Sequence, residues 1–510
     1  MSEQKMSRRK FLSVLAGTGA VGAAATLTGC SPVASTSGKG WLPNQYRNQS
    51  EMPAVVRGRV PFDPDDVSIS RDDSKCILCG QCIEACEKVQ SVFGYYELPT
   101  FDEFICVHCG QCALWCPTGS IMERDDTGKV EAALADPNMV VIGQPSPATR
   151  VGLGEEFGLP AGTWVEGQLA TSMKELGFNA ALDINFAADL TIMEEASELV
   201  ERVSKGGELP QFTSCCPAWV KFVEYYYPDL IPHLSSARSP IGMQGPIVKT
   251  YYAEKQGIDP KNIFNVTITP CVAKKFEASR PELNGAAVYH GDDSIKDNDV
   301  ILCAREYANL LRRNGIDLPS LPESQFDPLM GVGSGGGLIF GNTGGVMEAA
   351  LRSAYYFITG EQPPADLLDY KPVRGLEGIK RATVNIPTVG EVKVVVAHGL
   401  FNARKMCEEV RAGKADFHFL EVMACPGGCI SGGGQPRTSV PPQDWVRQAR
   451  IDTMYQKDAS YGLRNSHDNP EIQQLYKVFL GEPLGHMAHE LLHTKYHSRA
   501  EHLVPKKREI

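Results

Sequence analysis

The chain has no excess of basic residues and no strongly apolar run long enough to cross a membrane. It has 50 Lys and Arg against 61 Asp and Glu, a formal net charge of −11. This balance argues against nucleic acid as a partner. The weakly apolar stretch at residues 11–28 is rich in Gly, Ala and Thr, which is marginal for a bilayer core of roughly 30 Å. With 510 residues, the chain has room for about three domains of roughly 150 residues.

The N-terminus is typical of an export signal. A basic segment that contains Arg8 and Arg9 precedes the short apolar stretch. The arginine pair indicates the twin-arginine route, with the translocase as a partner and a periplasmic or extracytoplasmic location. A membrane anchor is the alternative. Leu27-Thr28-Gly29-Cys30 resembles a lipobox, which implies a lipid anchor at Cys30 after the signal (1–30), and we expect residues 31–65 to form a flexible tether.

Cysteine is the informative residue type. Of the 16 cysteines, eight fall between Cys76 and Cys116, and five more lie in three short motifs further along. A chain of this length does not need disulfide staples, and repeated C-x-x-C spacing indicates metal binding. We expect Cys303 and Cys407, which lie outside these motifs, to be buried core thiols.

Two cysteine runs share the spacing of a bacterial two-cluster ferredoxin. In that pattern, three cysteines of one run and the fourth of the other hold each [4Fe–4S] cluster, which predicts an α+β module over residues 66–130. Zinc ribbons and disulfides are the alternatives, but they rarely repeat this spacing. His108 is expected beside the second cluster or at the surface, and Glu87 replaces the usual proline. The predicted ligand sets are Cys76, Cys79, Cys82 and Cys116 for one cluster, and Cys106, Cys109, Cys112 and Cys86 for the other.

Three later motifs offer four more thiolates and a group of glycines. Four dispersed thiolates suit a further [4Fe–4S] cluster buried between lobes, and the glycines leave space for a bulky group. The motifs are Thr213-Ser214-Cys215-Cys216-Pro217-Ala218-Trp219, Thr269-Pro270-Cys271-Val272-Ala273-Lys274-Lys275-Phe276-Glu277, and Glu421-Val422-Met423-Ala424-Cys425-Pro426-Gly427-Gly428-Cys429 continuing to Pro436. The predicted ligands are Cys216, Cys271, Cys425 and Cys429, and Cys215 and Lys274 are left over beside them.

These motifs resemble the signature motifs of the [FeFe]-hydrogenase (iron-only hydrogenase) family, from about residue 70 to residue 500. The resemblance implies an H-cluster, in which the cube is joined through Cys429 to a diiron unit with CO, cyanide and a bridging dithiolate. Maturation enzymes would supply the diiron unit. The family pattern implies that Lys274 donates to one cyanide, that Met423 packs against the diiron unit, and that a further segment lines the other cyanide, namely Ser146, Pro147 and Ala148.

The resemblance also implies a proton path. Cys215 is the expected proton donor, with a thiol pKa lowered by nearby positive charge. Glu195, Glu198 and Arg202 share one face of a predicted helix over 192–203, and Ser235 completes the path. The alternative is that Glu198 and Arg202 form only a surface salt bridge.

Three positions depart from the family pattern. Thr269 stands where Met is usual, Ile241 where Gln is usual, and Ala218 where Gly is usual. Because the first two positions adjoin the diiron unit, we expect them to affect rate, direction or oxygen tolerance and not the class of reaction.

Two further patterns are rejected. Gly331-x-Gly333-x-x-Gly336 fits a dinucleotide fingerprint, but no convincing strand precedes it. His489 and His493 match a zinc-protease spacing, yet the surrounding residues resemble the family's small subunit, which implies a fused tail over 441–510.

Alternating strands and helices predict an α/β catalytic domain over residues 131–440, with two lobes around the cluster. Strands are expected at 140–143 and 392–397, and helices at 191–203 and 345–356. The implied reaction is reversible H2 = 2 H+ + 2 e−, with hydrogen uptake expected outside the cytoplasm and a cytochrome or another redox partner. The alternative is a hydrogenase-like iron–sulfur protein, a sensor or cluster carrier, with little hydrogen turnover.

Overall fold

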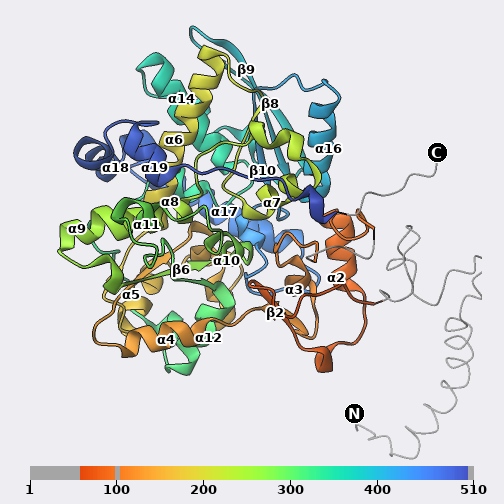
Figure 1. Ribbon diagram of the computed structural model, residues 1–510, viewed down its shortest axis with the longest axis vertical. Helices are drawn as coiled ribbons and strands as arrows, with labels where there is room; N and C mark the ends of the chain where they lie inside the picture. Colours follow the sequence, from red (N-terminus) through yellow and green to blue (C-terminus); the bar gives the residue numbers. More distant parts are fainter. Residues whose placement is uncertain (1–57, 98–103, 504–510) are drawn as a thin grey trace, which may run out of the picture. The chain divides into compact units, whose positions relative to one another are not determined.

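The computed structural model describes residues 58–97 and 104–503 of the chain, which Figure 1 draws in colour. The predicted export signal, the lipobox at Cys30 and most of the tether lie outside the described residues. Within the described ranges, no helix combines the length and apolar character that a membrane span requires.

The first described module is small and contains the two ferredoxin-like cysteine runs. Its strands β1 (Ile69–Arg71) and β2 (Ile121–Glu123) pair antiparallel, and its short helices are α2 (Gln81–Glu84) and α3 (Gln111–Trp115). The module's packing begins before residue 66, inside the predicted tether. Val60 is buried, and its backbone N–H donates to Cys82 Sγ at 3.4 Å.

The two cysteine runs end differently, for a reason visible in the sequence. Pro117 follows the second run, and a residue before proline is pushed toward extended backbone. Cys116 is accordingly extended (φ −76°, ψ 113°), and α3 stops at Trp115. Glu87 stands at the matching position of the first run, where the backbone continues as a π-helical turn over Ala85–Val89. The departure noted in the sequence therefore lengthens the helix that carries Cys86.

Two four-stranded sheets form the catalytic domain, as the two-lobe prediction required (Figure 1). One sheet is wholly parallel and the other has one antiparallel edge strand, β8. The first sheet, in spatial order, contains β4 (Ala180–Ala181), β3 (Val140–Pro145), β6 (Ile263–Thr269) and β7 (Val300–Cys303). The second contains β5 (Gln211–Phe212), β10 (Phe419–Met423), β9 (Gly390–His398) and β8 (Ile379–Ile386).

Burial along the strands follows from this topology. Central parallel strands are covered on both faces and read as continuous apolar runs. Strand β10 is buried at every residue, and β3 at every residue after Val140. The antiparallel edge strand β8 alternates between buried and more exposed positions over its second half.

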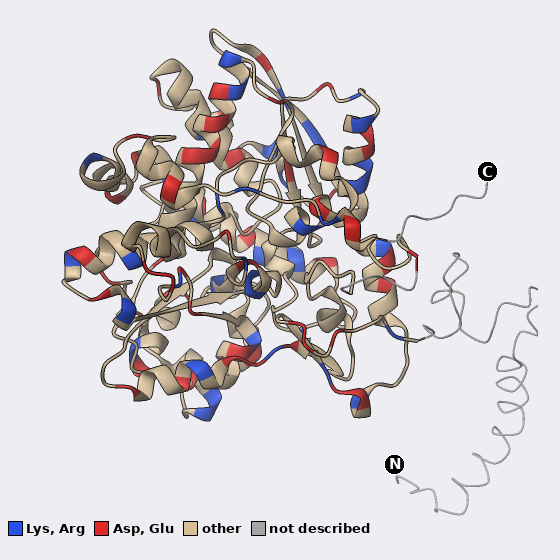
Figure 2. Cartoon of the chain, in the orientation of Figure 1, with Lys and Arg blue, Asp and Glu red and all other residues tan. Residues whose placement is uncertain are grey.

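The longest helix, α6 (Ile184–Lys205), begins eight residues before the predicted start at Ile192. The Asp183 side chain caps it by accepting from the Asn185 backbone N–H. Its first turns are buried on every side, so they lack the amphipathic period from which the prediction was made. Acidic and basic residues are interspersed along the exposed part of α6 and along α16 (Leu400–Arg411) in Figure 2.

The chemistry-bearing motifs leave the carboxyl ends of parallel strands. Strands β5 and β10 of one sheet lead to Cys215-Cys216 and to Cys425. Strands β3 and β6 of the other sheet lead to Ser146 and to Cys271. The carboxyl ends of parallel strands are the usual place for a ligand site, and here two such edges supply one centre.

The C-terminal segment packs on the catalytic domain through helices α17 (Asp444–Ser460), α18 (Pro470–Leu475) and α19 (His486–Leu492). In Figure 1, α18 lies beside α6, and α19 packs on α8 (Pro240–Ile247) and α11 (Gly285–His290). Asp458 of α17 is fully buried and receives a bidentate pair from Arg352 at 2.9 and 3.1 Å, and Arg464 at 2.6 Å. Arg352 lies on α14 (Gly345–Thr359), so this ion pair joins the tail to the domain.

The rejected dinucleotide fingerprint has a packing explanation. No strand lies at residues 314–334, and the five-residue helix α13 (Gly335–Ile339) begins within the fingerprint itself. A Cβ atom at Gly333 would lie 2.1 Å from Asn185 Cβ, and one at Gly335 would lie 2.1 Å from Asp458 Oδ1. These glycines therefore let α13 approach α6 and α17.

Removal of the buried tail carboxylate should destabilise the protein strongly. We expect Asp458→Ala to lower the free energy of unfolding by about 3–5 kcal/mol. Glu348 and Asp369 would remain to pair with Arg352, Arg374 and Arg464, which leaves one excess positive charge in a largely buried network. Glu131→Ala, which breaks the exposed Arg313–Glu131 pair, is the control and should cost less than about 1 kcal/mol. Calorimetric thermal unfolding measures both, and equal midpoints for the two variants would contradict the assignment.

Candidate metal centre

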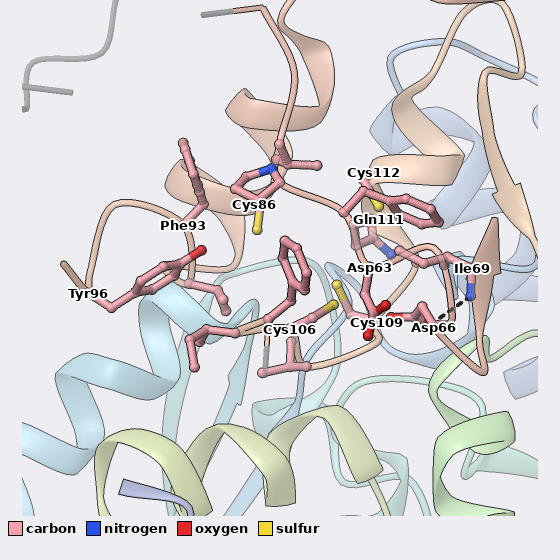
Figure 3. A pocket seen from close by; sticks show the side chains of 18 residues that line it. Asp63, Asp66, Ile69, Cys86, Phe93, Tyr96, Cys106, Cys109, Gln111 and Cys112 are labelled. Carbon is pink, nitrogen blue, oxygen red and sulfur yellow. Dashed lines mark hydrogen bonds between the residues drawn. The ribbon is translucent and has the colours of Figure 1, made fainter. Parts of the chain in front are cut away.

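Two cavities in the ferredoxin-like module are each lined by four cysteines. Each set combines the first three cysteines of one run with the fourth of the other, as the spacing predicted. Cys76, Cys79, Cys82 and Cys116 line one cavity, of about 20 Å³. Cys86, Cys106, Cys109 and Cys112 line the other, of about 50 Å³, shown in Figure 3.

The chemistry of these donors fits iron–sulfur clusters. Burial raises the pKa of the Cys109 and Cys112 thiols well above the ordinary value. Without metal such thiols hold their protons, and metal binding displaces them. The fifteen cysteines in the described ranges are all free of disulfides, so every thiol in these sets is available.

His108 joins the second cysteine run to the catalytic domain. Its ring stacks on Phe276 at 4.5 Å, with Nδ1 3.1 Å from Asp66 and Nε2 2.8 Å from Lys221 Nζ. The side chain is buried, so of the two expected positions it occupies the one beside the cysteines and not the surface.

A third group of thiols lies where the two sheet edges meet. Cys216, Cys271, Cys425 and Cys429 are close enough to influence one another's ionisation. Burial raises the pKa of Cys425 well above its ordinary value, and neighbouring thiols, led by Cys271 and including Cys109, add to the rise. The backbone N–H of Ala424 donates to Cys216 Sγ at 3.4 Å. Four converging thiols, of which Cys216 and Cys425 are buried and the other two half-buried, fit a third cube. The nearness of Cys109 to Cys425 places this cube next to the second ferredoxin-like cavity.

An apolar cavity of about 60 Å³ adjoins these thiols. It brings together residues from the three later cysteine motifs and from the segment Ser146-Pro147-Ala148. Its lining includes Ser146, Pro147, Ala148, Cys215, Ile241, Thr269, Cys271, Lys274, Met423 and Cys429. An apolar wall with one ammonium and one free thiol fits a compact anionic group with few polar ligands.

Lys274 is positioned by two partners. Its Nζ lies 3.0 Å from the Cys215 carbonyl oxygen and 2.6 Å from Glu277. Burial alone would lower the pKa of Lys274. The Glu277 carboxylate, together with the Cys271 and Cys215 thiols, outweighs burial and raises the pKa, so the ammonium stays charged. The sequence reasoning gave Glu277 no role, although its i, i+3 spacing from Lys274 on α10 (Ala273–Ala278) could have suggested one.

Cys215 is buried beside Glu195 and Lys274. Burial, followed by the charge of Glu195, raises the pKa of the thiol well above its ordinary value, and Lys274 opposes this only weakly. The expectation that positive charge lowers this pKa was wrong, because desolvation dominates. Cys215 is therefore a protonated thiol, able to donate.

The predicted proton path is partly connected by hydrogen bonds. Ser235 Oγ donates to Glu198 Oε2 at 2.6 Å, and Arg202 pairs with Glu198 Oε1 at 2.6 Å. Glu195 is fully buried, and neither carboxylate oxygen has a hydrogen-bond partner of normal geometry within the described ranges. Burial, and then the charges of Glu198 and Glu421, raise the pKa of Glu195 to about 8. A buried carboxyl that titrates near neutrality suits proton transfer.

The tail contributes contacts that the motifs did not reveal. His493 Nδ1 lies 2.8 Å from Ser236 Oγ, and its Nε2 lies 2.9 Å from Glu194 Oε2. Both ring nitrogens are thus engaged, which leaves none for zinc. The Arg238 backbone N–H donates to the Leu492 carbonyl oxygen at 2.8 Å. The tail therefore braces the segment that carries Ser235.

The departures from the family pattern have visible consequences. Thr269 Oγ1 accepts from the Cys271 backbone N–H at 3.2 Å, a bond that a methionine could not make. Ile241 lines the same cavity with a purely apolar side chain. Ala218 is buried in α7 (Pro217–Tyr226).

Comparison with known families covers almost all of the described chain. The family described as "Iron only hydrogenase large subunit, C-terminal domain" matches residues 139–433, and "Iron hydrogenase small subunit" matches residues 444–499. A "4Fe-4S dicluster domain" matches residues 75–120. The three matches follow one another along the chain in the order of the described module, catalytic domain and tail.

Individual relatives give the same result. The NADP-reducing hydrogenase subunit HndD of Solidesulfovibrio fructosivorans is 43% identical over 85% of this chain and 75% of its own length. The periplasmic [Fe] hydrogenase large subunit of Nitratidesulfovibrio vulgaris is 46% identical over 73% of this chain and 88% of its own. The structure of a variant of [FeFe]-hydrogenase HydA1 from Chlamydomonas reinhardtii superposes with a TM-score of 0.62 at 40% identity, covering 72% of this chain and 98% of that one.

The pKa of Glu195 predicts a protonation change near neutral pH. Because burial raises this pKa to about 8, we expect the carboxyl to be mostly protonated at pH 7 and to ionise as the pH rises past 8. Infrared difference spectra between pH 7 and pH 9 should show the loss of a protonated-carboxyl band. Glu195→Gln should lack that band, and an unmodified protein whose band is already absent at pH 7 would contradict the prediction.

Proposed function

This chain belongs to the iron-only hydrogenase family, and on that premise we propose that it oxidises hydrogen outside the cytoplasm and passes the electrons to a cytochrome or another redox partner. It is a hydrogenase with ferredoxin-type [4Fe–4S] clusters and an H-cluster. The observation that supports the proposal best is the meeting of four dispersed thiols beside a cavity lined by Cys215 and Lys274.

The cysteines that line the same cavity, or that converge on the same point, are the ligands that we assign to each cluster. Cys76, Cys79, Cys82 and Cys116 would hold the first ferredoxin-type cluster, and Cys86, Cys106, Cys109 and Cys112 the second. Cys216, Cys271, Cys425 and Cys429 would hold the cube of the H-cluster, with Cys429 in the wall of the cavity for the diiron unit. Electrons would then leave by way of Cys109, the ferredoxin-type thiol next to Cys425.

The remaining cavity residues would hold the bound group in position and keep water away from it. The Lys274 ammonium would donate to an anionic ligand, at a position fixed by Glu277 and the Cys215 carbonyl. Met423 and the segment from Ser146 to Ala148 form apolar wall and keep water out. When bound, the H-cluster supplies the redox chemistry that relates H2 to two protons and two electrons.

The residues of the chain move the protons. The Cys215 thiol would exchange a proton with the cavity, and Glu195, its buried neighbour, would relay it. Ser235 and Glu198, joined at 2.6 Å, would carry it onward, and Arg202 would hold Glu198 in place. Glu198 and Arg202 are both slightly exposed, so solvent reaches the end of this path.

A cluster-carrier function is the weaker candidate. More distant relatives include the cytosolic iron–sulfur assembly component 3 of Bos taurus, 29% identical over 77% of this chain. A carrier would have no use for a second, apolar cavity with a free thiol and an ammonium at its wall. The presence of Cys215, Lys274 and Glu195 around that cavity therefore favours turnover.

Location and direction rest on the N-terminal sequence. Arg8 and Arg9 before a short apolar stretch support twin-arginine export, which carries folded proteins and so suits a chain that receives its clusters first. Cys30 would then anchor the chain to lipid. The N. vulgaris relative, a hydrogenase subunit named as periplasmic, adds support. Outside the cytoplasm, hydrogen uptake is the natural direction.

Replacement of the proton-donor thiol should block turnover without emptying the site. We expect Cys215→Ser to lower hydrogen oxidation and evolution by about a hundredfold or more, because general acid–base groups contribute about 10²–10⁴. Infrared bands from bound CO and cyanide should persist, which shows that the diiron unit is still present. Retention of more than half of the turnover would refute the role of Cys215.

Intact cells can test location and direction together. With hydrogen as donor, we expect cells that make the protein to reduce a membrane-impermeant redox dye. The Arg8→Lys/Arg9→Lys double variant should lose that activity in intact cells and keep it in lysed cells. Strong hydrogen evolution with no uptake would overturn the direction, and dye reduction only after lysis of unmodified cells would overturn the location.

A further inference from the structure

The two cysteine runs contain the same four residues, Cys-Gly-Gln-Cys, at 79–82 and 109–112. The local backbone is also the same. Gly80 (φ 78°) and Gly110 (φ 69°) are left-handed, and Gln81 and Gln111 are the first residues of the helices α2 and α3. The chain therefore places one side chain type in two equivalent positions.

The surroundings of the two glutamines differ. Gln81 is half-buried at the wall of the first cysteine cavity. Gln111 is fully buried, and its Nε2 donates to Cys425 Sγ at 3.2 Å and to the Ser431 carbonyl oxygen at 2.9 Å. Cys425 and Ser431 both belong to the third motif of the catalytic domain, more than 300 positions away along the chain.

The hydrogen bonds fix the orientation of the Gln111 amide. A metal-bound thiolate and a carbonyl oxygen are both acceptors, so only the two N–H groups of Nε2 can face them. The carbonyl oxygen Oε1 is then buried without a hydrogen-bond partner among the residues described. An unpaired buried oxygen is unfavourable, so packing alone does not explain an amide here.

The backbones are in contact at the same place. A Cβ atom at Gly110 would lie 3.2 Å from Gly433 Cα, and one at Gly433 would lie 2.5 Å from the Cys109 carbonyl oxygen. The second ferredoxin-like loop and the third motif can approach this closely only because both residues are glycine. Gln111 thus lies at the junction between the cysteines of the second cavity and Cys425.

We propose that Gln111 is a positioning residue for electron transfer, which raises the reduction potential of the cube at Cys425 by donating a hydrogen bond to that sulfur. This rests on the ligand assignment given under the proposed function. Hydrogen bonds to cluster sulfurs stabilise the reduced, more negative state. In hydrogen uptake, one electron leaves the cube, which is oxidised, and enters the neighbouring cluster, which is reduced, with no proton transferred.

The experiment compares Gln111→Met with Gln81→Met in the matured holoenzyme. Methionine keeps the length of the side chain and removes the N–H donors, and Gln81 provides the matched control in the equivalent position. Redox titrations followed by electron paramagnetic resonance measure the potential of the cube. We expect Gln111→Met to lower it by an amount that makes reduction of the cube about tenfold less favourable, or about 59 mV for one electron. Gln81→Met should leave the potential of the cube unchanged.

A second variant of Gln111 keeps the test decisive if Gln111→Met fails to fold or loses its iron. Gln111→Leu removes the donors and adds no charge, so it too should lower the potential of the cube. An unchanged potential in a variant of Gln111 that retains its iron would overturn the inference, as would an equal decrease in Gln81→Met. Absence of CO and cyanide infrared bands from the unmodified, matured protein would instead defeat the proposed function, so the two failures are distinguishable.

Discussion

The meeting of the two sheets at the carboxyl ends of their parallel strands is the constraint on which the site depends. Strands β5 and β10 deliver Cys216 and Cys425, and β6 delivers Cys271 from the other sheet. No single loop could bring these thiols together, because they lie far apart in sequence. The centre therefore forms only when the two sheets pack against each other in their native arrangement. Because the thiols come together only in the folded chain, metal binding and folding depend on each other.

Buried ion pairs hold the modules around this centre. Lys275 lies 2.6 Å from Asp126 and 3.0 Å from Glu306, and Arg305 pairs with Glu123 of β2. The pairs made by Asp126 and Glu123 join the ferredoxin-like module to the catalytic domain. Since a buried pair costs desolvation energy, the gain lies in a defined geometry between the modules and not in stability.

Local patterns in the sequence predicted much of the fold and of the candidate site. The features that they did not predict depend on packing between residues far apart in the chain. Cysteine spacing predicted which thiols meet in each ferredoxin-like cavity, and the residues around Lys274 and Cys215 were expected together from the family resemblance. The pKa of Cys215 was mispredicted, because burial cannot be read from spacing. The contact of Gln111 with Cys425 and the support that His493 gives to Ser236 join residues that are hundreds of positions apart and carry no periodic signal.

The iron content of the matured, purified protein is the most direct test of the central claim, that dispersed thiols hold a third cube with a two-iron unit beside two ferredoxin-type cubes. The expected value is about 14 iron atoms per chain, four in each of three cubes and two in the diiron unit. If the protein holds only about eight iron atoms per chain after complete maturation, which is the content of two cubes, the claim is contradicted.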